Sequence, residues 1–300
     1  MAFLKSFSFD PVNLMMFMPP NATYTESLDG LFWVPRKRGS ALSSRRQPLP
    51  CTLHRSEKAP KYFVIYCHGN AMDLGDSFDW VEEFARQTGT FCLAFDYAGY
   101  GIARQTSLTP CEASVTQDVI EVYDFVRDEL AWPAERVILY GQSIGSGVAT
   151  ACAAHAAKRK DKIMGLFLHS GYTSIRDMAV SFVGVVGNLI PNRFNNRALF
   201  RHLTCPVLLS HGDQDEVVPY HMSVALNQMY NGNPISLFHS AAGHGHNDLD
   251  VRKDIAEPFI HFMEEIERQR DTAGAQIPPP PAFTGAEVEV FVHPWNITKE

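Results

Sequence analysis

The stretch Gly141-Gln142-Ser143-Ile144-Gly145 decides the fold expected of this chain. It lies between a short apolar run, Arg136–Tyr140, and a segment of small residues, Gly145–Lys158. The first is typical of a buried strand and the second of a helix, so the stretch between them is a strand-to-helix turn. In such a tight turn only small residues fit beside the serine, whose hydroxyl is held out of the sheet next to a helix N-terminus. We therefore predict that Ser143 is a nucleophile, and a glycine turn with a hydrogen-bonded serine is the alternative.

Strands and helices alternate along the chain on both sides of this turn. Short apolar runs predict strands at 62–67, 91–95, 136–140, 164–168, 206–210 and 235–238. Amphipathic or small-residue segments predict helices at 74–88, 113–130, 145–158, 220–230 and 254–268. This alternation predicts an α/β fold with a parallel sheet that is covered by helices on both faces. Residues 31–34 and 51–54 are expected to add antiparallel edge strands.

The chain divides into three parts by composition. A length of 300 residues suits one large domain, which we expect at 31–270. An N-terminal extension, 1–30, precedes it, and a Pro-rich C-terminal tail, 271–300, follows it. Four consecutive prolines at 278–281 predict an extended polyproline conformation in the tail. We expect the tail to act as a spacer, with binding to a partner's aromatic groove as the alternative.

A serine hydroxyl is nearly inert until a base removes its proton, so a histidine held by a carboxylate must accompany Ser143. With a nucleophile on a strand-to-helix turn, the acid precedes the histidine in the sequence. Asp213, Asp215 and Glu216 all follow the predicted strand 206–210, at the end of the strand where catalytic groups of open parallel sheets lie. We favour Asp215, and Asp213 is the alternative acid. If Asp213 is not catalytic, we expect its side chain to cap the turn.

Two histidines, His244 and His246, follow the predicted strand 235–238. We favour His246 as the base because it precedes the helix that closes the domain, and His244 is then an ordinary loop residue. A metal site formed by these two residues and His239 is a third interpretation. No carboxylate or thiol cluster supports it, so we expect neither a metal nor a cofactor.

The tetrahedral intermediate of acyl transfer needs hydrogen-bond donors for its oxygen. In this arrangement the donors are the backbone N–H of the residue after the nucleophile, here Ile144, and an N–H of the loop after an early strand. We assign the second donor to Asn70 in the loop that begins at His68. His68 itself and Asp96, at the end of the next strand, are expected to have structural roles.

The composition argues against several functional classes. The net charge is −7, with 26 basic and 33 acidic residues, which does not indicate a nucleic-acid partner. The cysteines occur singly, as reduced core thiols of a cytosolic protein do, rather than in a disulfide or zinc pattern. The six are Cys51, Cys67, Cys92, Cys111, Cys152 and Cys205. No secretory signal and no apolar run of about 20 residues is apparent, so we expect a cytoplasmic protein. The sequence does not indicate an oligomeric state.

Six motifs occur together in this chain and are similar to those of a known family. They are His68–Gly75, Phe95–Gly101, Leu139–Gly145, Leu168–Ser170, Ser210–Asp215 and Gly245–Asp248. The set resembles the α/β-hydrolase-domain proteins of the Bem46-like group, and most closely their protein-depalmitoylase branch. The resemblance covers roughly residues 17–268 and implies the α/β-hydrolase fold, with a mostly parallel central sheet and a small cap between Gly171 and Leu203.

The resemblance also implies an activity. Members of that branch are palmitoyl-protein thioesterases, which remove palmitate from S-acylated cysteines of membrane-bound proteins. Residue by residue, Asp215 and His246 align with the family's catalytic triad, rather than Asp213 and His244. The expected partner is accordingly an acylated protein or a lipid ester.

One stretch departs from the family. Members of that branch carry an N-terminal cysteine cluster that is itself palmitoylated, whereas Asn13–Pro20 contains no cysteine. We therefore do not expect this anchor, and a reversible peripheral membrane contact through the run Met15–Met18 is the alternative. In the cap, the apolar segment Met178–Ile190 is expected either to line an acyl groove or to form a buried helix, because periodicity does not separate the two.

The same three catalytic groups serve several substrate classes, so the sequence leaves alternatives open. Lipid esters of the monoacylglycerol type and the peptide bonds cleaved by serine aminopeptidases are two of them. A non-catalytic scaffold that has a hydrolase fold and binds partners through its Pro-rich tail is the alternative from another class, because a fold alone does not prove activity.

Overall fold

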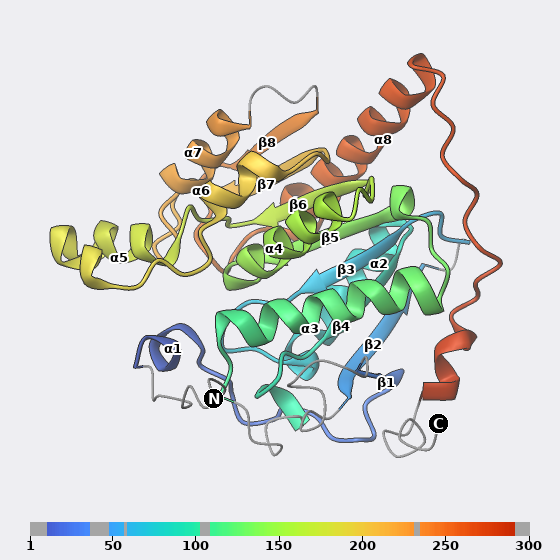
Figure 1. The fold of residues 1–300 in the computed structure, drawn as a ribbon, viewed down its shortest axis with the longest axis horizontal. Coiled ribbons are helices and arrows are strands. Elements are labelled where there is room, and N and C mark those ends of the chain that lie inside the picture. The colour runs from blue at the N-terminus through green and yellow to red at the C-terminus, as the bar shows by residue number, and fades with distance from the viewer. Residues whose placement is uncertain (1–10, 37–47, 57–58, 103–108, 231–234, 292–300) are drawn as a thin grey trace, which may run out of the picture.

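The computed structural model describes residues 11–36, 48–56, 59–102, 109–230 and 235–291. A twisted sheet of eight strands in the order β1-β2-β4-β3-β5-β6-β7-β8 runs through the molecule (Figure 1). The strands are β1 (Leu31–Val34), β2 (Leu49–Arg55), β3 (Phe63–Cys67), β4 (Phe91–Phe95), β5 (Val137–Gln142), β6 (Gly165–His169), β7 (Val207–Gly212) and β8 (Ser236–Ala241). β1 and β2 pair antiparallel at one edge, and β3 to β8 are parallel, which confirms the mostly parallel sheet with antiparallel edge strands.

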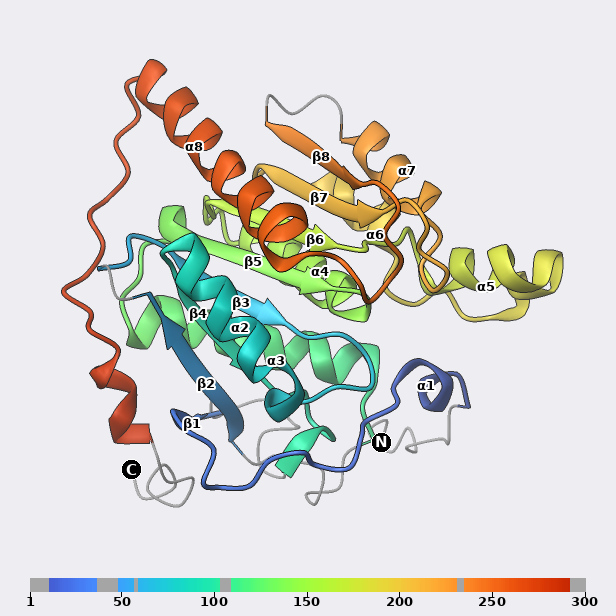
Figure 2. The ribbon, with the colours of Figure 1, turned by 180° about the vertical axis from the view of Figure 1, so that it is seen from behind.

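Helices cover both faces of the sheet. They are α1 (Pro11–Met16), α2 (Leu74–Thr88), α3 (Glu112–Asp124), α4 (Ile144–Lys158), α5 (Ile175–Val183), α6 (Asn196–Leu199), α7 (His221–Met229) and α8 (Glu257–Thr272). α3 and α4 lie in front of the sheet in Figure 1, and α2 and α8 lie in front of it in the opposite view of Figure 2. The predicted helix 113–130 ends in a π-helical turn at 125–129, and the predicted helix 254–268 begins with one at 251–256.

The alternation of side chains along β3 explains why both faces must be covered. Phe63, Ile65 and Cys67 pack with residues of α3 and α4, whereas Val64 and Tyr66 pack with residues of α2 and α8. All five side chains are buried, as expected for a parallel strand that is apolar throughout. The cysteines are unpaired, and five of the six are buried, which confirms these five as core thiols, whereas Cys111 is half-buried.

The turn between β5 and α4 depends on two glycines. A Cβ atom at Gly145 would lie closer than 3.0 Å to the carbonyl oxygens of Cys67 and His68, in and just after β3. A Cβ atom at Gly141 would come equally close to the backbone of Gly145. Since real Cβ atoms do not make such contacts, only glycine lets α4 begin this near to the strands.

The expected membrane contact through the run Met15–Met18 is wrong for two of its side chains. Met16 and Phe17 are buried, and the Phe17 ring packs edge-on against Phe194 at a centroid distance of 6.2 Å. These two side chains are therefore unavailable to a membrane, whereas Met18 is 54% exposed. The side chain of Met15 lies outside the described residues. No helix in the described ranges is long and apolar enough to cross a bilayer.

The C-terminal tail, as far as Phe291, packs on the domain and is not a free spacer. It leaves α8 and returns along the edge of the molecule towards β1 (Figure 1). The ring of Phe283 contacts Phe63, Phe91 and Trp132, and Val288 is buried. Residues 292–300 lie outside the described part of the chain.

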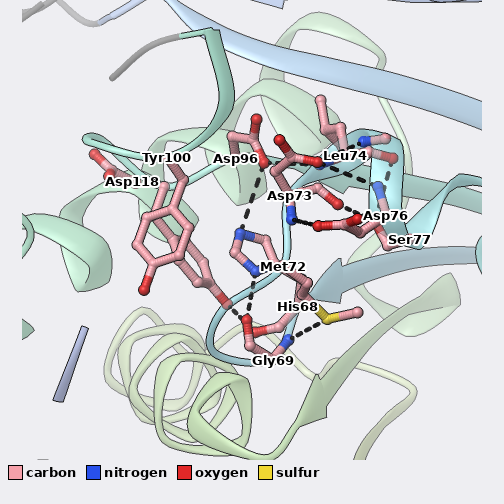
Figure 3. Close-up of polar contacts among 12 residues, drawn as sticks. His68, Gly69, Met72, Asp73, Leu74, Asp76, Ser77, Asp96, Tyr100 and Asp118 are labelled. Atoms are coloured by element: carbon pink, nitrogen blue, oxygen red, sulfur yellow. Dashed lines mark hydrogen bonds and ion pairs between the residues drawn. The ribbon is translucent and has the colours of Figure 1, made fainter. Parts of the chain in front are cut away.

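Two buried carboxylates anchor the loop that follows β3 (Figure 3). Asp96, at the end of β4, accepts hydrogen bonds from the Tyr24 hydroxyl and from the backbone N–H of Leu74 at 3.0 Å. Asp73 caps the N-terminus of α2 and also accepts from the backbone N–H of Thr23 at 2.8 Å. The segment before β1 is therefore tied to the β3–α2 loop at two points, and the expected anchoring role of Asp96 is confirmed.

His68 completes this network from the end of β3. Its ring stacks on Tyr97 at a centroid distance of 4.0 Å, and its Nδ1 donates to the carbonyl oxygen of Gly69 at 2.7 Å. The side chain is buried, and burial lowers the pKa of His68 to about 4. His68 is thus a neutral structural residue of the loop, as expected.

The buried histidines predict a loss of stability in acid. Burial lowers the pKa of His54 and His68 to about 4 and that of His169 to about 3, against an ordinary value of 6.5. As the pH falls from about 6.5 towards 4, the unfolded chain binds more protons than the folded one, so the free energy of unfolding decreases. His68→Gln should lower the slope of this decrease by up to about 1.4 kcal/mol per pH unit, measured by urea denaturation across this range.

Tyr97→Phe is the matched control. It removes the hydrogen bond from the Tyr97 hydroxyl to the carbonyl oxygen of His68 at 2.8 Å. It does not remove any group that titrates in acid. It should lower stability without changing the slope. A slope in His68→Gln equal to that of the wild type would contradict the prediction.

Candidate active site

The candidate site lies at the carboxyl edge of the sheet. Ser143 follows β5, Asp215 follows β7, His246 follows β8, and the loop with Asn70 follows β3. These strands are parallel, so their carboxyl ends meet at one edge, which is where open α/β sheets bind ligands.

The backbone of Ser143 is strained. Its φ of 52° and ψ of −120° lie where L-residues are rarely found. The conformation is held by a hydrogen bond from its N–H to the carbonyl oxygen of His169 at 2.9 Å, and by α4, which begins at the next residue. The turn thus directs the Ser143 side chain out of the sheet edge, as a strained strand-to-helix turn does.

The structure brings the three predicted catalytic side chains together. Ser143 Oγ lies 3.1 Å from His246 Nε2, and His246 Nδ1 lies 2.7 Å from Asp215 Oδ2. A carboxylate only accepts hydrogen bonds, so Nδ1 of the neutral imidazole carries the proton and Nε2 accepts from the serine hydroxyl. The ring of His246 is 9% exposed and is therefore largely shielded from water.

Asp215 is saturated with donors. Its Oδ1 accepts from the backbone N–H groups of Val217 at 2.8 Å and Val218 at 2.7 Å. Its Oδ2 lies within hydrogen-bond distance of both His246 and, at 3.1 Å, His211 Nε2. Burial raises the pKa of Asp215, but the hydrogen bonds from His211 and His246 outweigh it and hold the pKa well below its ordinary value.

His211 was not among the residues predicted from the sequence. Its ring is fully buried, its Nε2 is also 2.9 Å from the carbonyl oxygen of Val218, and its Nδ1 is 2.6 Å from Ser223 Oγ. Because the partners of Nε2 are acceptors, this nitrogen donates to Asp215. The sequence feature that could have indicated it is a histidine near the end of the predicted strand, four residues before Asp215.

The competing residues form other hydrogen bonds. Asp213 Oδ1 accepts from the backbone N–H of Gly243 at 2.7 Å, so it links the loops after β7 and β8, which differs from the expected capping of its own turn. His244 Nδ1 lies 2.8 Å from the carbonyl oxygen of Asp248, and its side chain is 36% exposed. Glu216 is exposed to solvent. Within the described ranges, no group of three or more His, Cys, Asp or Glu side chains is arranged to hold a metal ion.

The two predicted oxyanion donors border the nucleophile. Ile144 is the first residue of α4, and the first N–H groups of a helix have no acceptor within it. The loop that carries Asn70 passes beside Ser143, since a Cβ atom at Gly69 would lie 3.8 Å from the Cβ of Ser143. Their role as oxyanion donors stays a prediction.

The side chain of Asn70 ties this loop to the N-terminal segment. Its Nδ2 donates to the carbonyl oxygen of Met16 at 2.9 Å, and its Oδ1 accepts from the backbone N–H of Met18 at 2.9 Å. The Tyr100 hydroxyl donates to the same oxygen at 2.9 Å. The segment after α1 is thereby held against the loop as one wall of a cleft.

That cleft has a volume of about 690 Å³ and opens onto Ser143. Among the described residues that line it, His246 is the only histidine, and there is no lysine, arginine or carboxylate; most of this lining is apolar. α5 supplies one wall with Ile175, Met178 and Phe182, and no residue of this helix is buried. The groove-lining interpretation of the cap segment is therefore confirmed, and the buried-helix interpretation is wrong.

Comparison with known proteins finds relatives that are similar in sequence. The family model described as serine aminopeptidase, S33, matches residues 58–200. The α/β-hydrolase domain-containing protein aho-3 of Caenorhabditis elegans is 26% identical over an alignment of 269 positions that covers 84% of this chain and 77% of that protein. The lysophosphatidylserine lipase ABHD12 of Rattus norvegicus is 26% identical over an alignment of 231 positions that covers 69% of this chain and 57% of that protein.

Among solved structures, Est1E from Butyrivibrio proteoclasticus superposes with a TM-score of 0.58 at 19% identity, covering 80% of this chain and all of that one. This likeness concerns the fold, and it agrees with the eight-stranded, mostly parallel sheet described above. The chain thus has the α/β-hydrolase fold and is similar in sequence to the α/β-hydrolase domain-containing proteins.

Proposed function

We propose that this protein is a serine hydrolase of acyl thioesters and esters, and that its substrates are proteins S-acylated with long-chain fatty acids. The observation that carries the proposal is the chain of hydrogen bonds from Ser143 through His246 to Asp215, at 3.1 and 2.7 Å, beside the apolar cleft.

In the proposed reaction, Ser143 Oγ attacks the carbonyl carbon of the thioester while His246 Nε2 accepts the hydroxyl proton. The N–H groups of Asn70 and Ile144 donate to the resulting oxyanion. The intermediate collapses with cleavage of the C–S bond, and His246 returns the proton to the departing cysteine sulfur. Water then attacks the acyl-enzyme with His246 as the base, which releases the fatty acid and restores Ser143. Asp215 orients the imidazole and stabilises its charged form throughout.

The cleft supports a long acyl chain as the group that is recognised. Ligand pockets for small organic molecules measure about 300–1,000 Å³ and are predominantly apolar, and a cleft of about 690 Å³ fits that class. An aliphatic chain has no hydrogen-bonding groups, so it gives up no hydrogen bonds to water when it packs against an apolar wall such as α5. The resemblance of the sequence motifs to protein depalmitoylases favours a thioester on a protein.

A lipid ester is the second candidate substrate, because one relative of this chain is named as a lysophosphatidylserine lipase. Both candidates require the same nucleophile, base and acid. They differ only in the leaving group, which is a cysteine thiol for an acylated protein and a glycerol hydroxyl for a lipid.

The assignment of the three catalytic groups predicts that substitution of His246 lowers kcat far more than substitution of His244. Ser143→Ala and His246→Ala should each lower kcat on a chromogenic acyl ester by a factor on the order of 10⁴ or more, because they remove the nucleophile or its base. Ser143→Ala should also abolish labelling by a fluorophosphonate probe. His244→Ala is the matched control from the same loop, and its kcat should stay within about threefold of the wild type.

Two outcomes would reject this assignment. One is undiminished fluorophosphonate labelling of Ser143→Ala. The other is a loss of turnover in His244→Ala that His246→Ala does not share. Absence of turnover by the wild type on every ester and thioester would instead favour a non-catalytic scaffold.

Substitution of His211 is predicted to change kcat but not KM. In the proposed reaction it is a positioning residue, because it donates to Asp215 and does not reach the substrate. His211→Leu removes this donor and should lower kcat about ten- to hundredfold through misalignment of His246, with KM unchanged. His211→Gln can still donate to Asp215 and should recover most of the loss. Wild-type kcat in His211→Leu, in protein with an unchanged circular dichroism spectrum, would contradict the role.

The substrate class is tested by a panel of palmitoyl thioester peptide, palmitoyl glycerol, acetyl thioester and an aminoacyl amide. The palmitoyl thioester should have the highest kcat/KM. Ala179→Phe places a ring into the wall of the cleft and should lower kcat/KM for palmitoyl substrates about tenfold, with acetyl substrates unaffected. Ser181→Phe, at an exposed position of the same helix, is the control. A panel led by palmitoyl glycerol or by the amide would reject the thioester as substrate.

A further inference from the structure

Exposed apolar side chains gather around the mouth of the cleft. Ten large apolar side chains are exposed in the described residues, and eight of them belong to segments that border this cleft. Five lie on the last residues of α5 and the turn that follows it, and we call them the apolar tip. They are Phe182, Val183, Val185, Val186 and Leu189. Large apolar patches on a soluble protein mark an interaction surface.

The apolar tip projects away from the body of the protein. Both opposite views show α5 extending beyond the sheet and its covering helices, at the same end of the molecule as α1 (Figures 1 and 2). Val185 is 82% and Leu189 is 83% exposed. No charged residue occurs from 178 to 192, and the exposed apolar side chains there are interrupted only by uncharged polar residues such as Ser181 and Asn188.

The charges that flank the apolar tip are mostly positive. Residues 171–205 contain four arginines and one aspartate, a net charge of +3 in a chain whose net charge is −7. Arg176 and Arg193 stand on either side of the uncharged run, and Arg197 and Arg201 follow. Two of these arginines are near carboxylates, Arg193 at 3.9 Å from Glu112 and Arg197 at 3.5 Å from Asp177. An apolar surface with basic flanks matches a bilayer, whose apolar interior is bordered by anionic headgroups.

The apolar tip is continuous with the cleft. Phe182 belongs to the tip and also lines the cleft, and Leu14 and Met18 add exposed apolar surface from the N-terminal segment that forms another wall. An acyl chain that leaves a bilayer beside the apolar tip would reach Ser143 along apolar side chains, without crossing water.

We infer that the apolar tip inserts into the surface of an anionic lipid bilayer and presents the mouth of the cleft to membrane-borne acyl groups. The flanking arginines lie among the headgroups, and Phe182 links the inserted surface to the cleft. The purpose of this contact rests on the proposed function, but the contact itself is measured without catalysis.

The test is flotation of the full-length protein with vesicles of phosphatidylcholine that contain phosphatidylserine. Val185→Ser, Val186→Ser and Leu189→Ser are combined in one variant, since these side chains are exposed and do not line the cleft. The bound fraction should fall at least about tenfold, because binding strength scales with the apolar area that enters the bilayer. Met229→Ser with Val290→Ser is the matched control, which removes exposed apolar side chains away from the cleft and should bind as the wild type does.

Two further measurements separate this inference from the proposed function. Hydrolysis of a short soluble ester by the triple variant should equal that of the wild type, which shows that the fold and the site are intact. Vesicles of phosphatidylcholine alone should bind less protein than anionic vesicles do. If the wild type floats with vesicles but hydrolyses nothing, the proposed function fails and the inferred contact stands.

Several results would overturn the inferred contact. Equal flotation of the wild type and the triple variant would exclude the apolar tip, and absence of flotation of the wild type would exclude the bilayer. Equal binding to both vesicle compositions would remove the role of the arginines. A wild-type dimer that the triple variant converts to a monomer in analytical ultracentrifugation, without vesicle binding, would show that a second copy covers the apolar tip.

Discussion

The geometry of the whole site depends on the close approach of helix α4 to strands β3 and β5. Neither Gly141 nor Gly145 has room for a Cβ atom, so the chain can turn from strand to helix only with glycine there. The turn holds Ser143 at a positive φ, a strain on the order of 1–3 kcal/mol that the buried strands on either side sustain. Because this strain directs the serine hydroxyl out of the sheet edge, every other group of the site is defined relative to it.

Hydrogen bonds to buried side chains hold the loops around this turn. Asp215 receives four donors, and one of them comes from a second buried histidine, His211. On the other side of the nucleophile, the Asn70 side chain and the buried Asp96 tie the N-terminal segment to the loop after β3. Hydrogen bonds to buried residues thus hold the polar groups of the site in place. The cleft that these groups face is apolar and, at α5, open to solvent.

Local patterns in the sequence were sufficient for most of the fold. Buried parallel strands are continuous apolar runs, so their positions could be predicted to within a few residues, and β4 was predicted without error. The cap segment Met178–Ile190 was harder, because an apolar run has the same pattern whether it faces a core, a cleft or solvent. In the structure one side of this segment lines the cleft, as one of the two interpretations predicted. Its end is exposed to solvent, which periodicity does not encode.

By itself, the sequence determined the alternation of strands and helices, the glycine turn around Ser143, and the two loops that carry the candidate acid and base. Only the tertiary structure decided that His246 and Asp215, rather than His244 and Asp213, form one hydrogen-bonded chain with the serine. It also decided that Met16 and Phe17 are buried while the apolar tip is exposed. The physical reason is distance along the chain: His246 is 103 residues from Ser143 and 31 from Asp215, and contacts over such separations arise only when the sheet aligns the ends of its strands.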